Sequence, residues 1–243
     1  MLLEGGNQVS ASLFPQEVQL FRHNGFVKLP TQFSLEKVRA LKTVILQNID
    51  QAIEPVVRQN DRIIRISNLW SRGRVFRESI ASDEILDPLE KLLGSNIEFV
   101  LNRHNHVYLR DRSSTHSLEP HRDVMHWSRT IVTVLVYLED TSVENGCTHV
   151  VPGSHHLPDL LNFADQEHLN KIVREQCIPV PMLAGEMLAI DSMIIHSAGR
   201  NQTDGTRMSM TLGYHSVDEL LPVDNSKRVL VRGQRIYRGN DIN

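Results

Sequence analysis

Apolar residues recur at helical spacing in the first part of the chain. From Leu35 to Ile49 they are three or four residues apart, which predicts an amphipathic helix that ends near residue 50. Ser34 precedes this run and suits an N-cap. Pro15 to His23 predicts a shorter helix that begins with a proline, and residues 85–93 predict a third.

Residues 55–80 are harder to assign because charged and apolar residues alternate without a clear period. We expect a solvated helix and loop region, with a substrate-facing role as the alternative. The segment carries six arginines: Arg58, Arg62, Arg65, Arg72, Arg74 and Arg77.

From residue 96 the pattern changes to that of strands. The β-branched run IVTVLVYL at 131–138 is long enough for a fully buried strand. Four other segments have strand-like composition, with turn residues between them: 97–109, 147–151, 186–190 and 206–215. Helices followed by many short strands favour a mainly β protein, in which a helical layer (about 15–93) packs on an antiparallel barrel or jelly roll (about 96–217). We expect a single domain over residues 1–243, with a C-terminal segment at 218–243.

Composition and charge narrow the class of partner. The formal net charge is only −3, from 26 basic and 29 acidic residues, which argues against a nucleic-acid partner. No apolar run approaches the roughly 20 residues that cross a bilayer. With two cysteines and an acidic N-terminus unlike a signal peptide, we expect a cytoplasmic protein, monomeric or homodimeric, that acts on a small molecule.

One short motif carries the candidate chemistry. His121 and Asp123 are two residues apart, so on a strand both side chains point to the same face. A third ligand must come from elsewhere, and our choice is His196, which follows the predicted strand near residue 190. Two histidines and one carboxylate are the ligand set of non-haem iron oxygenases. Alone, such a pair is more often an ordinary hydrogen-bonding pair.

Four separate elements, in order, resemble the phytanoyl-CoA dioxygenase family of iron(II)/2-oxoglutarate oxygenases. They are PQEVQLFRHNGFVKL at 15–29, His121-Arg122-Asp123, the pair ENGC (144–147) and VPGSH (151–155), and GEMLAIDSMIIHSAGRNQTDGTR at 185–207. The resemblance covers about residues 15–217. It implies a double-stranded β-helix, a cupin-like jelly-roll barrel.

The resemblance also implies a set of functional residues. His121, Asp123 and His196 would be the catalytic metal ligands for Fe(II). Arg207, eleven residues after His196, would hold the far carboxylate of the co-substrate 2-oxoglutarate. Arginine presents a planar fork to a carboxylate, and such a charge-assisted bond contributes about 1.5–3 kcal/mol.

Asp123 also bears on the reaction. Related halogenases carry Gly or Ala in its place, so a retained aspartate favours oxygen chemistry with O₂. The resemblance therefore implies hydroxylation of an unactivated C–H bond in a small metabolite or natural-product intermediate, with release of succinate and CO₂. Desaturation, cyclisation, epimerisation and a non-catalytic metal-binding or ligand-binding barrel are the alternatives.

Further residues are weaker candidates. Asn102, His104 and His106 alternate in the predicted strand at 97–109, so they should share a face, and Asn102 is a candidate for co-substrate binding. Thr133 could donate its hydroxyl group to a co-substrate carboxylate. Candidates for substrate contact are His104, His126, Trp127, Arg122 and Tyr237. Tyr237 belongs to the C-terminal segment, which is either a basic edge strand or a flap over the barrel mouth.

Overall fold

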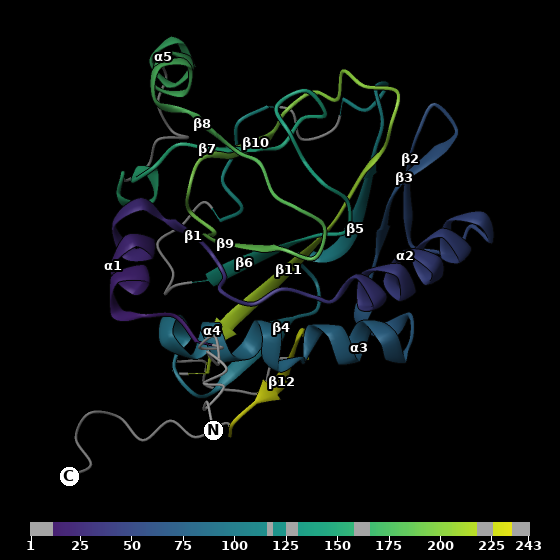
Figure 1. The fold of residues 1–243 in the computed structure, drawn as a ribbon, viewed down its shortest axis with the longest axis horizontal. Coiled ribbons are helices and arrows are strands. Elements are labelled where there is room, and N and C mark those ends of the chain that lie inside the picture. Colours follow the sequence, from purple (N-terminus) through teal and green to yellow (C-terminus); the bar gives the residue numbers. More distant parts are fainter. Residues whose placement is uncertain (1–11, 116–118, 125–130, 158–165, 218–225, 235–243) are drawn as a thin grey trace, which may run out of the picture.

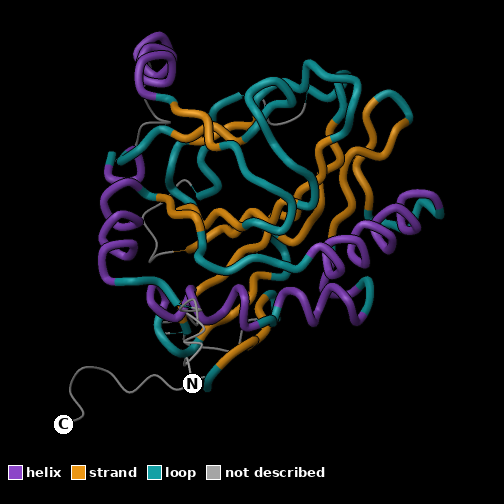
Figure 2. The backbone as a smooth tube through the Cα atoms, in the orientation of Figure 1, coloured by secondary structure: helices purple, strands orange, loops and turns teal. Residues whose placement is uncertain are grey.

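The computed structural model describes residues 12–115, 119–124, 131–157, 166–217 and 226–234. Its main feature is a pair of antiparallel sheets, with helices packed outside the larger one (Figures 1 and 2). This arrangement confirms the predicted mainly β fold with flanking helices, and it is that of a double-stranded β-helix. Whether the whole chain is one domain stays a prediction.

The larger sheet has nine strands. Its main path runs through β1 (Phe26–Lys28), β9 (Met187–Asp191), β6 (Ile131–Tyr137), β11 (Arg207–Ser216), β5 (Asn105–Arg110), β3 (Arg62–Ser67) and β2 (Val56–Gln59). Off this path, β4 (Ile97–Val100) pairs with β11 and with β12 (Arg228–Arg232). The smaller sheet has the order β10 (His196–Ala198), β7 (Thr148–Val150) and β8 (Ile178–Val180).

The predicted helices are confirmed, and their ends have clear physical causes. They are α1 (Pro15–Asn24), α2 (Leu35–Asp50) and α4 (Asp83–Leu93); the structure adds α3 (Arg74–Ile80) and α5 (Gln166–Gln176). Ser34 caps α2 because its hydroxyl accepts a hydrogen bond from the Lys37 N–H at 3.2 Å. Gly25 ends α1 in the left-handed conformation, with φ at 82°. None of the described helices is both long and apolar enough to cross a lipid bilayer.

Successive side chains of β6 point to opposite faces of the large sheet, one toward the main core and the other toward the space between the two sheets. Val132, Val134 and Val136 are fully buried in the main core, which α2, α3 and α4 cover from outside the sheet (Figure 1). Leu135 and Tyr137 face the other way, into a smaller apolar cluster shared with the smaller sheet. One face of the sheet therefore stabilises the fold, and the other is available for a site.

The predicted strand at 97–109 is wrong as a single element. It is divided into β4 and β5 by a bend at residues 101–104, and His104 has φ at +49°. β5 pairs with β11 along one part of its length and β4 pairs with a later part, so the bend lets two strands share one long neighbour.

The expected helix and loop region at 55–80 is also partly wrong. Residues 56–67 form the β2–β3 hairpin, joined by Asn60 and Asp61, both with positive φ. Asn and Asp tolerate that conformation, which two-residue hairpin turns require. This pair between two β-branched runs was therefore a sequence signal for the hairpin.

Candidate active site

Three side chains converge at one end of the interior between the sheets. One potential ligand atom from each of His121, Asp123 and His196 lies within 4.8 Å of the other two. The two histidines are held together by reciprocal backbone hydrogen bonds, each with an N···O distance of 2.9 Å. The backbone itself thus brings the His121 segment to the start of β10.

Both histidine rings are oriented in the same way. Nδ1 of His121 lies 3.0 Å from the carbonyl oxygen of Glu119, and Nδ1 of His196 lies 3.1 Å from that of Ile194. A carbonyl oxygen only accepts, so Nδ1 carries the proton in each ring. Each Nε2 then keeps its lone pair, which is the tautomer that binds a metal ion.

Asp123 is held from two sides. Its Oδ2 accepts a hydrogen bond from the Thr133 hydroxyl at 2.9 Å, and its Oδ1 lies 3.0 Å from Nε2 of His104 and 3.7 Å from Nε2 of His196. Burial raises the pKa of the Asp123 carboxyl, but the electrostatic interaction with His196 and the hydrogen bonds from His104 and Thr133 lower it well below its usual range. The group is therefore a carboxylate, as a metal ligand must be.

A pocket of about 370 Å³ opens beside these three residues. Its floor is the inner face of the large sheet, where side chains at alternate positions of β3, β5 and β11 line it. Arg207 at the start of β11 is only 3% exposed, and its Nε and Nη1 atoms find no hydrogen-bond acceptor among the described residues. A buried guanidinium in this state suits an anionic ligand.

Arg110 lies directly opposite Arg207, because the two residues are paired across β5 and β11. Burial, together with the positive charge of Arg207, lowers the pKa of Arg110 to about 10. Its guanidinium carbon lies 4.4 Å from the centre of the Tyr108 ring, a favourable cation–π contact. Two adjacent buried arginines make this end of the pocket strongly electropositive.

Comparison with known proteins places the chain in a family. The model of the phytanoyl-CoA dioxygenase (PhyH) family matches residues 21–209. The chain belongs to the phytanoyl-CoA dioxygenase family. The predicted resemblance is confirmed, and the matched residues include all three members of the His-Asp-His cluster and Arg207.

The chain has low sequence identity to individual relatives. It is 25% identical over 178 residues to the multifunctional dioxygenase ausE of Emericella nidulans, across 65% of this chain and 59% of that protein. It is 23% identical over 229 residues to the iron/alpha-ketoglutarate-dependent dioxygenase penM of Penicillium thymicola, across 84% of this chain and 69% of that protein. The chain thus spans about three fifths to two thirds of the length of these relatives.

Solved structures of other proteins share the fold. The non-haem alpha-ketoglutarate-dependent epimerase SnoN from nogalamycin biosynthesis superposes with a TM-score of 0.72 at 22% identity, across 90% of this chain and 98% of that one. At this identity the likeness shows the fold alone.

Of the other residues that we predicted to contact co-substrate or substrate in this PhyH-family chain, some line the pocket and others do not. Asn102 and His104 line the pocket, although they lie in the bend before β5 rather than on a strand face. Thr133 is fully buried, and its hydroxyl lies 2.9 Å from both Asp123 Oδ2 and Ser192 Oγ. The structure therefore places Thr133 behind Asp123, and it is not among the residues that line the pocket, contrary to our expectation of a co-substrate contact.

Arg122 does not line the pocket. It is 5% exposed, and its Nη2 donates to the carbonyl oxygens of Ser154 and Leu157, both at 2.6 Å. The alternation that brings His121 and Asp123 together turns the residue between them the other way. Arg122 therefore anchors the 154–157 turn, and a substrate contact at this residue stays a prediction that its described contacts do not support.

Three further candidates, His126, Trp127 and Tyr237, lie outside the described residues. The part of the C-terminal segment that is described forms the edge strand β12, where Arg232 bonds to three carboxylates of α4: Asp83, Asp87 and Glu90. The cation of Arg232 is thus engaged with α4, as the edge-strand alternative predicts.

Sequence reasoning missed Arg110, because its place in the pocket depends on where β5 begins. Once β5 is known to start at Asn105, its pocket-lining residues His106, Tyr108 and Arg110 follow from alternation.

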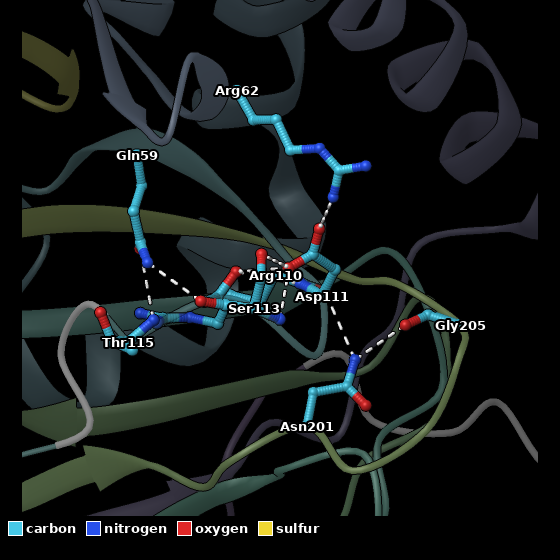
Figure 3. Close-up of polar contacts among 9 residues, drawn as sticks. Gln59, Arg62, Arg110, Asp111, Ser113, Thr115, Asn201 and Gly205 are labelled. Carbon is cyan, nitrogen blue, oxygen red and sulfur yellow. Dashed lines mark hydrogen bonds and ion pairs between the residues drawn. The ribbon is translucent and has the colours of Figure 1, made fainter.

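A polar network holds the end of β5 in place (Figure 3). In it, Asn201 Nδ2 donates to the carbonyl oxygens of Gly205 at 2.8 Å and Arg110 at 3.5 Å. In the same network, Asp111 pairs with Arg62 at 2.8 Å.

Proposed function

We propose that this protein is an Fe(II)/2-oxoglutarate-dependent dioxygenase that hydroxylates an unactivated C–H bond of a small metabolite or natural-product intermediate. One observation carries the proposal. The potential ligand atoms of His121, Asp123 and His196 come together in one pocket. The buried guanidinium of Arg207, whose Nε and Nη1 have no acceptor among the described residues, lines the same pocket. Membership of the PhyH family supports this assignment.

The three side chains suit iron(II). Two imidazole nitrogens and one carboxylate oxygen form the facial ligand set that leaves coordination positions open for other ligands. Outside this set, Thr133 and His104 bond to Asp123, and two backbone carbonyls fix the histidine rings. Such outer contacts orient the ligands before the metal binds.

Arg207 and Arg110 suit the far carboxylate of 2-oxoglutarate. Each guanidinium presents a planar set of donors, and a carboxylate accepts from such a fork in two parallel bonds. The co-substrate would also bring a negative charge to Arg207, whose buried Nε and Nη1 have no acceptor among the described residues. The two arginines would hold the co-substrate in one orientation relative to Asp123 and the two histidines.

When bound, iron(II) with 2-oxoglutarate and O₂ would supply an oxidation in which one oxygen atom enters the C–H bond, the other enters succinate, and CO₂ is released. The chain's own contribution is positioning. His121, Asp123 and His196 would hold the metal, Arg207 would orient the co-acid, and Leu135 adds an apolar side chain to the lining of the pocket.

The type of oxidation is part of the proposal. The dioxygenases ausE and penM support an oxygenation, and the epimerase SnoN, which shares the fold, supports epimerisation as the second candidate. Product mass separates the two. Hydroxylation adds one oxygen atom, epimerisation leaves the mass unchanged, and desaturation or cyclisation removes two hydrogen atoms.

The compartment is also proposed. Cys147 and Cys177 are both free thiols, as expected in a reducing environment. We propose that the protein acts in the cytoplasm.

The proposal predicts slow oxidation of 2-oxoglutarate even without a primary substrate. Succinate should form only when Fe(II), 2-oxoglutarate and O₂ are all present, and His196→Ala should reduce its formation to background. His149→Ala is a matched control, because Nδ1 of His149 also bonds to the carbonyl two residues earlier, but His149 lies outside the cluster. Succinate formation that survives in His196→Ala, or that fails in both variants alike, would contradict the assignment.

A further inference from the structure

Besides Arg110 and Arg207, a third arginine on a strand of the large sheet lines the pocket. Arg65 lies on β3, directly opposite Tyr108 of β5, and its Nη1 donates to the Tyr108 hydroxyl at 3.2 Å. Ser67, two residues further along β3, lines the pocket on the same face. The neighbouring Ile64 and Ile66 are buried, with Ile66 in the main core. Alternation along β3 therefore presents Arg65 to the pocket.

Arg65 differs from the other arginines of the β2–β3 hairpin. Arg58 pairs with Glu54 at 3.0 Å, and Arg62 pairs with Asp111 at 2.8 Å. Within the described parts of the chain, Arg65 has no carboxylate at ion-pair distance, and its buried Nε has no hydrogen-bond acceptor. Its polar contact is a neutral phenol, a weaker acceptor than a carboxylate. The guanidinium that faces the pocket is the one without an anionic partner.

Arg65 is separate from Arg207 of the proposed co-substrate site. In the sheet, β5 lies between β3 and β11, which carries Arg207. Neighbouring strands are about 4.8 Å apart, so the two backbones are separated by roughly 10 Å. Arg65 and Arg207 can therefore serve two different groups.

Charge in the loaded pocket also favours an anionic substrate. The two negative charges of 2-oxoglutarate would be matched by Arg110 and Arg207, and the charge of Asp123 would offset half of the Fe(II) charge. One positive charge of Fe(II) would then remain, and the guanidinium of Arg65 adds another. His106 beside it contributes no charge, since burial and the charges of His104 and Arg65 lower its pKa to about 3.

We propose that Arg65, with the Tyr108 hydroxyl, binds a carboxylate group of the primary substrate, and that the enzyme therefore acts on small carboxylic acids. The inference rests on the proposed function, because 2-oxoglutarate must occupy the Arg207 end of the pocket. The carboxylate of the substrate would accept from Nε and from a terminal nitrogen of Arg65, which gives the missing acceptor to the buried donor. This contact fixes one end of the substrate on β3 and directs the rest of the molecule toward the metal ligands.

The test uses calorimetric titration of the full-length protein, loaded anaerobically with Fe(II) and 2-oxoglutarate. The probes are phenylacetate and its neutral counterpart phenylacetamide. The wild type should bind the acid more tightly than the amide. In Arg65→Met, binding of the acid should weaken about ten- to one-hundred-fold, to the level of the amide. Arg58→Met, which removes the same charge from the same hairpin outside the pocket, should bind both probes as the wild type does.

The visible absorption of iron-bound 2-oxoglutarate, recorded on the same samples, separates the two claims. If the band forms in both proteins but Arg65→Met binds phenylacetate as well as the wild type, the inference is overturned and the proposed function stands. The same holds if the wild type does not prefer the acid to the amide. If no band forms in the wild type, the proposed function fails and this inference fails with it.

Discussion

Thr133 shows how one buried hydroxyl can prepare a metal ligand. It is fully buried on β6 and donates to Oδ2 of Asp123. Thr133→Val keeps the shape of the side chain and removes this bond, so the carboxylate loses a fixed orientation. We predict that Fe(II) binds about 10- to 100-fold more weakly to Thr133→Val, as measured by anaerobic calorimetry.

Thr133→Ser is the matched control for this prediction. Serine keeps the hydroxyl group, so Fe(II) affinity should stay within a few-fold of the wild type. Equal affinity in the valine and serine variants would show that the hydrogen bond to Asp123 has no part in metal binding.

Arg207 should contribute to function at the expense of stability. Its buried donors lack acceptors among the described residues, which costs folding free energy. Arg207→Met should therefore raise the free energy of unfolding, measured by urea denaturation without 2-oxoglutarate, by about 1 kcal/mol or more. The same variant should bind 2-oxoglutarate at least about tenfold more weakly.

Arg112→Met is a suitable control for the stability effect. Arg112 is exposed and pairs with the exposed Asp204, so its replacement should change the free energy of unfolding by less than about 0.5 kcal/mol. A lower stability of Arg207→Met than of Arg112→Met would contradict the view that Arg207 is held ready to bind an anionic ligand.

The sequence was informative about residues that belong to motifs and much less so about residues that depend on pairing. His121, Asp123, His196 and Arg207 could be named because short motifs mark them. Arg110 and Arg65 could not, because each faces the pocket only through the register of its strand. Those registers depend on contacts with β11 and β5, which no local pattern specifies.

At the scale of elements, the turn before β7 places the strand that carries His196. Gly146 has φ at +83°, and a Cβ atom there would overlap the carbonyl group of Gly199, just after β10. Gly146→Ala should therefore lower the free energy of unfolding by at least about 2 kcal/mol, through backbone strain and this overlap, as measured by urea denaturation.

Gly205→Ala tests whether the effect is specific. A Cβ atom at Gly205 would meet only the Thr203 hydroxyl oxygen, at an ordinary 3.7 Å, and no positive φ is involved. This variant should be as stable as the wild type to within about 0.5 kcal/mol. Equal stability of the two alanine variants would mean that the approach of Gly146 to Gly199 does not constrain β10.

Helices were easier to predict than strand breaks, and the reason is physical. The ends of α1 and α2 are encoded locally, by Gly25 and by the Ser34 cap. The bend at 101–104 is not, because His104 takes its positive φ where Gly213 of β11 lies against it and donates to its carbonyl oxygen at 2.8 Å. Such a contact joins residues more than one hundred positions apart.

On the scale of the whole molecule, the two sheets have different roles in the fold and in the site. The large sheet and its outer helices hold the main core, whereas its inner face carries three of the arginines that line the pocket, Arg65, Arg110 and Arg207. The smaller sheet supplies His196, and a backbone bridge joins it to His121. A metal ion bound by His121, Asp123 and His196 would therefore link the segment before β6 to the smaller sheet.

The most direct test of this account is an anaerobic titration of the metal-free protein with Fe(II) and then 2-oxoglutarate, followed by visible absorption. We predict a weak charge-transfer band that needs both additions, is lost in His196→Ala and persists in His149→Ala. If iron binds but 2-oxoglutarate produces no band, then the co-substrate assignment and the role of Arg207 are wrong, and the site belongs to another kind of metal protein.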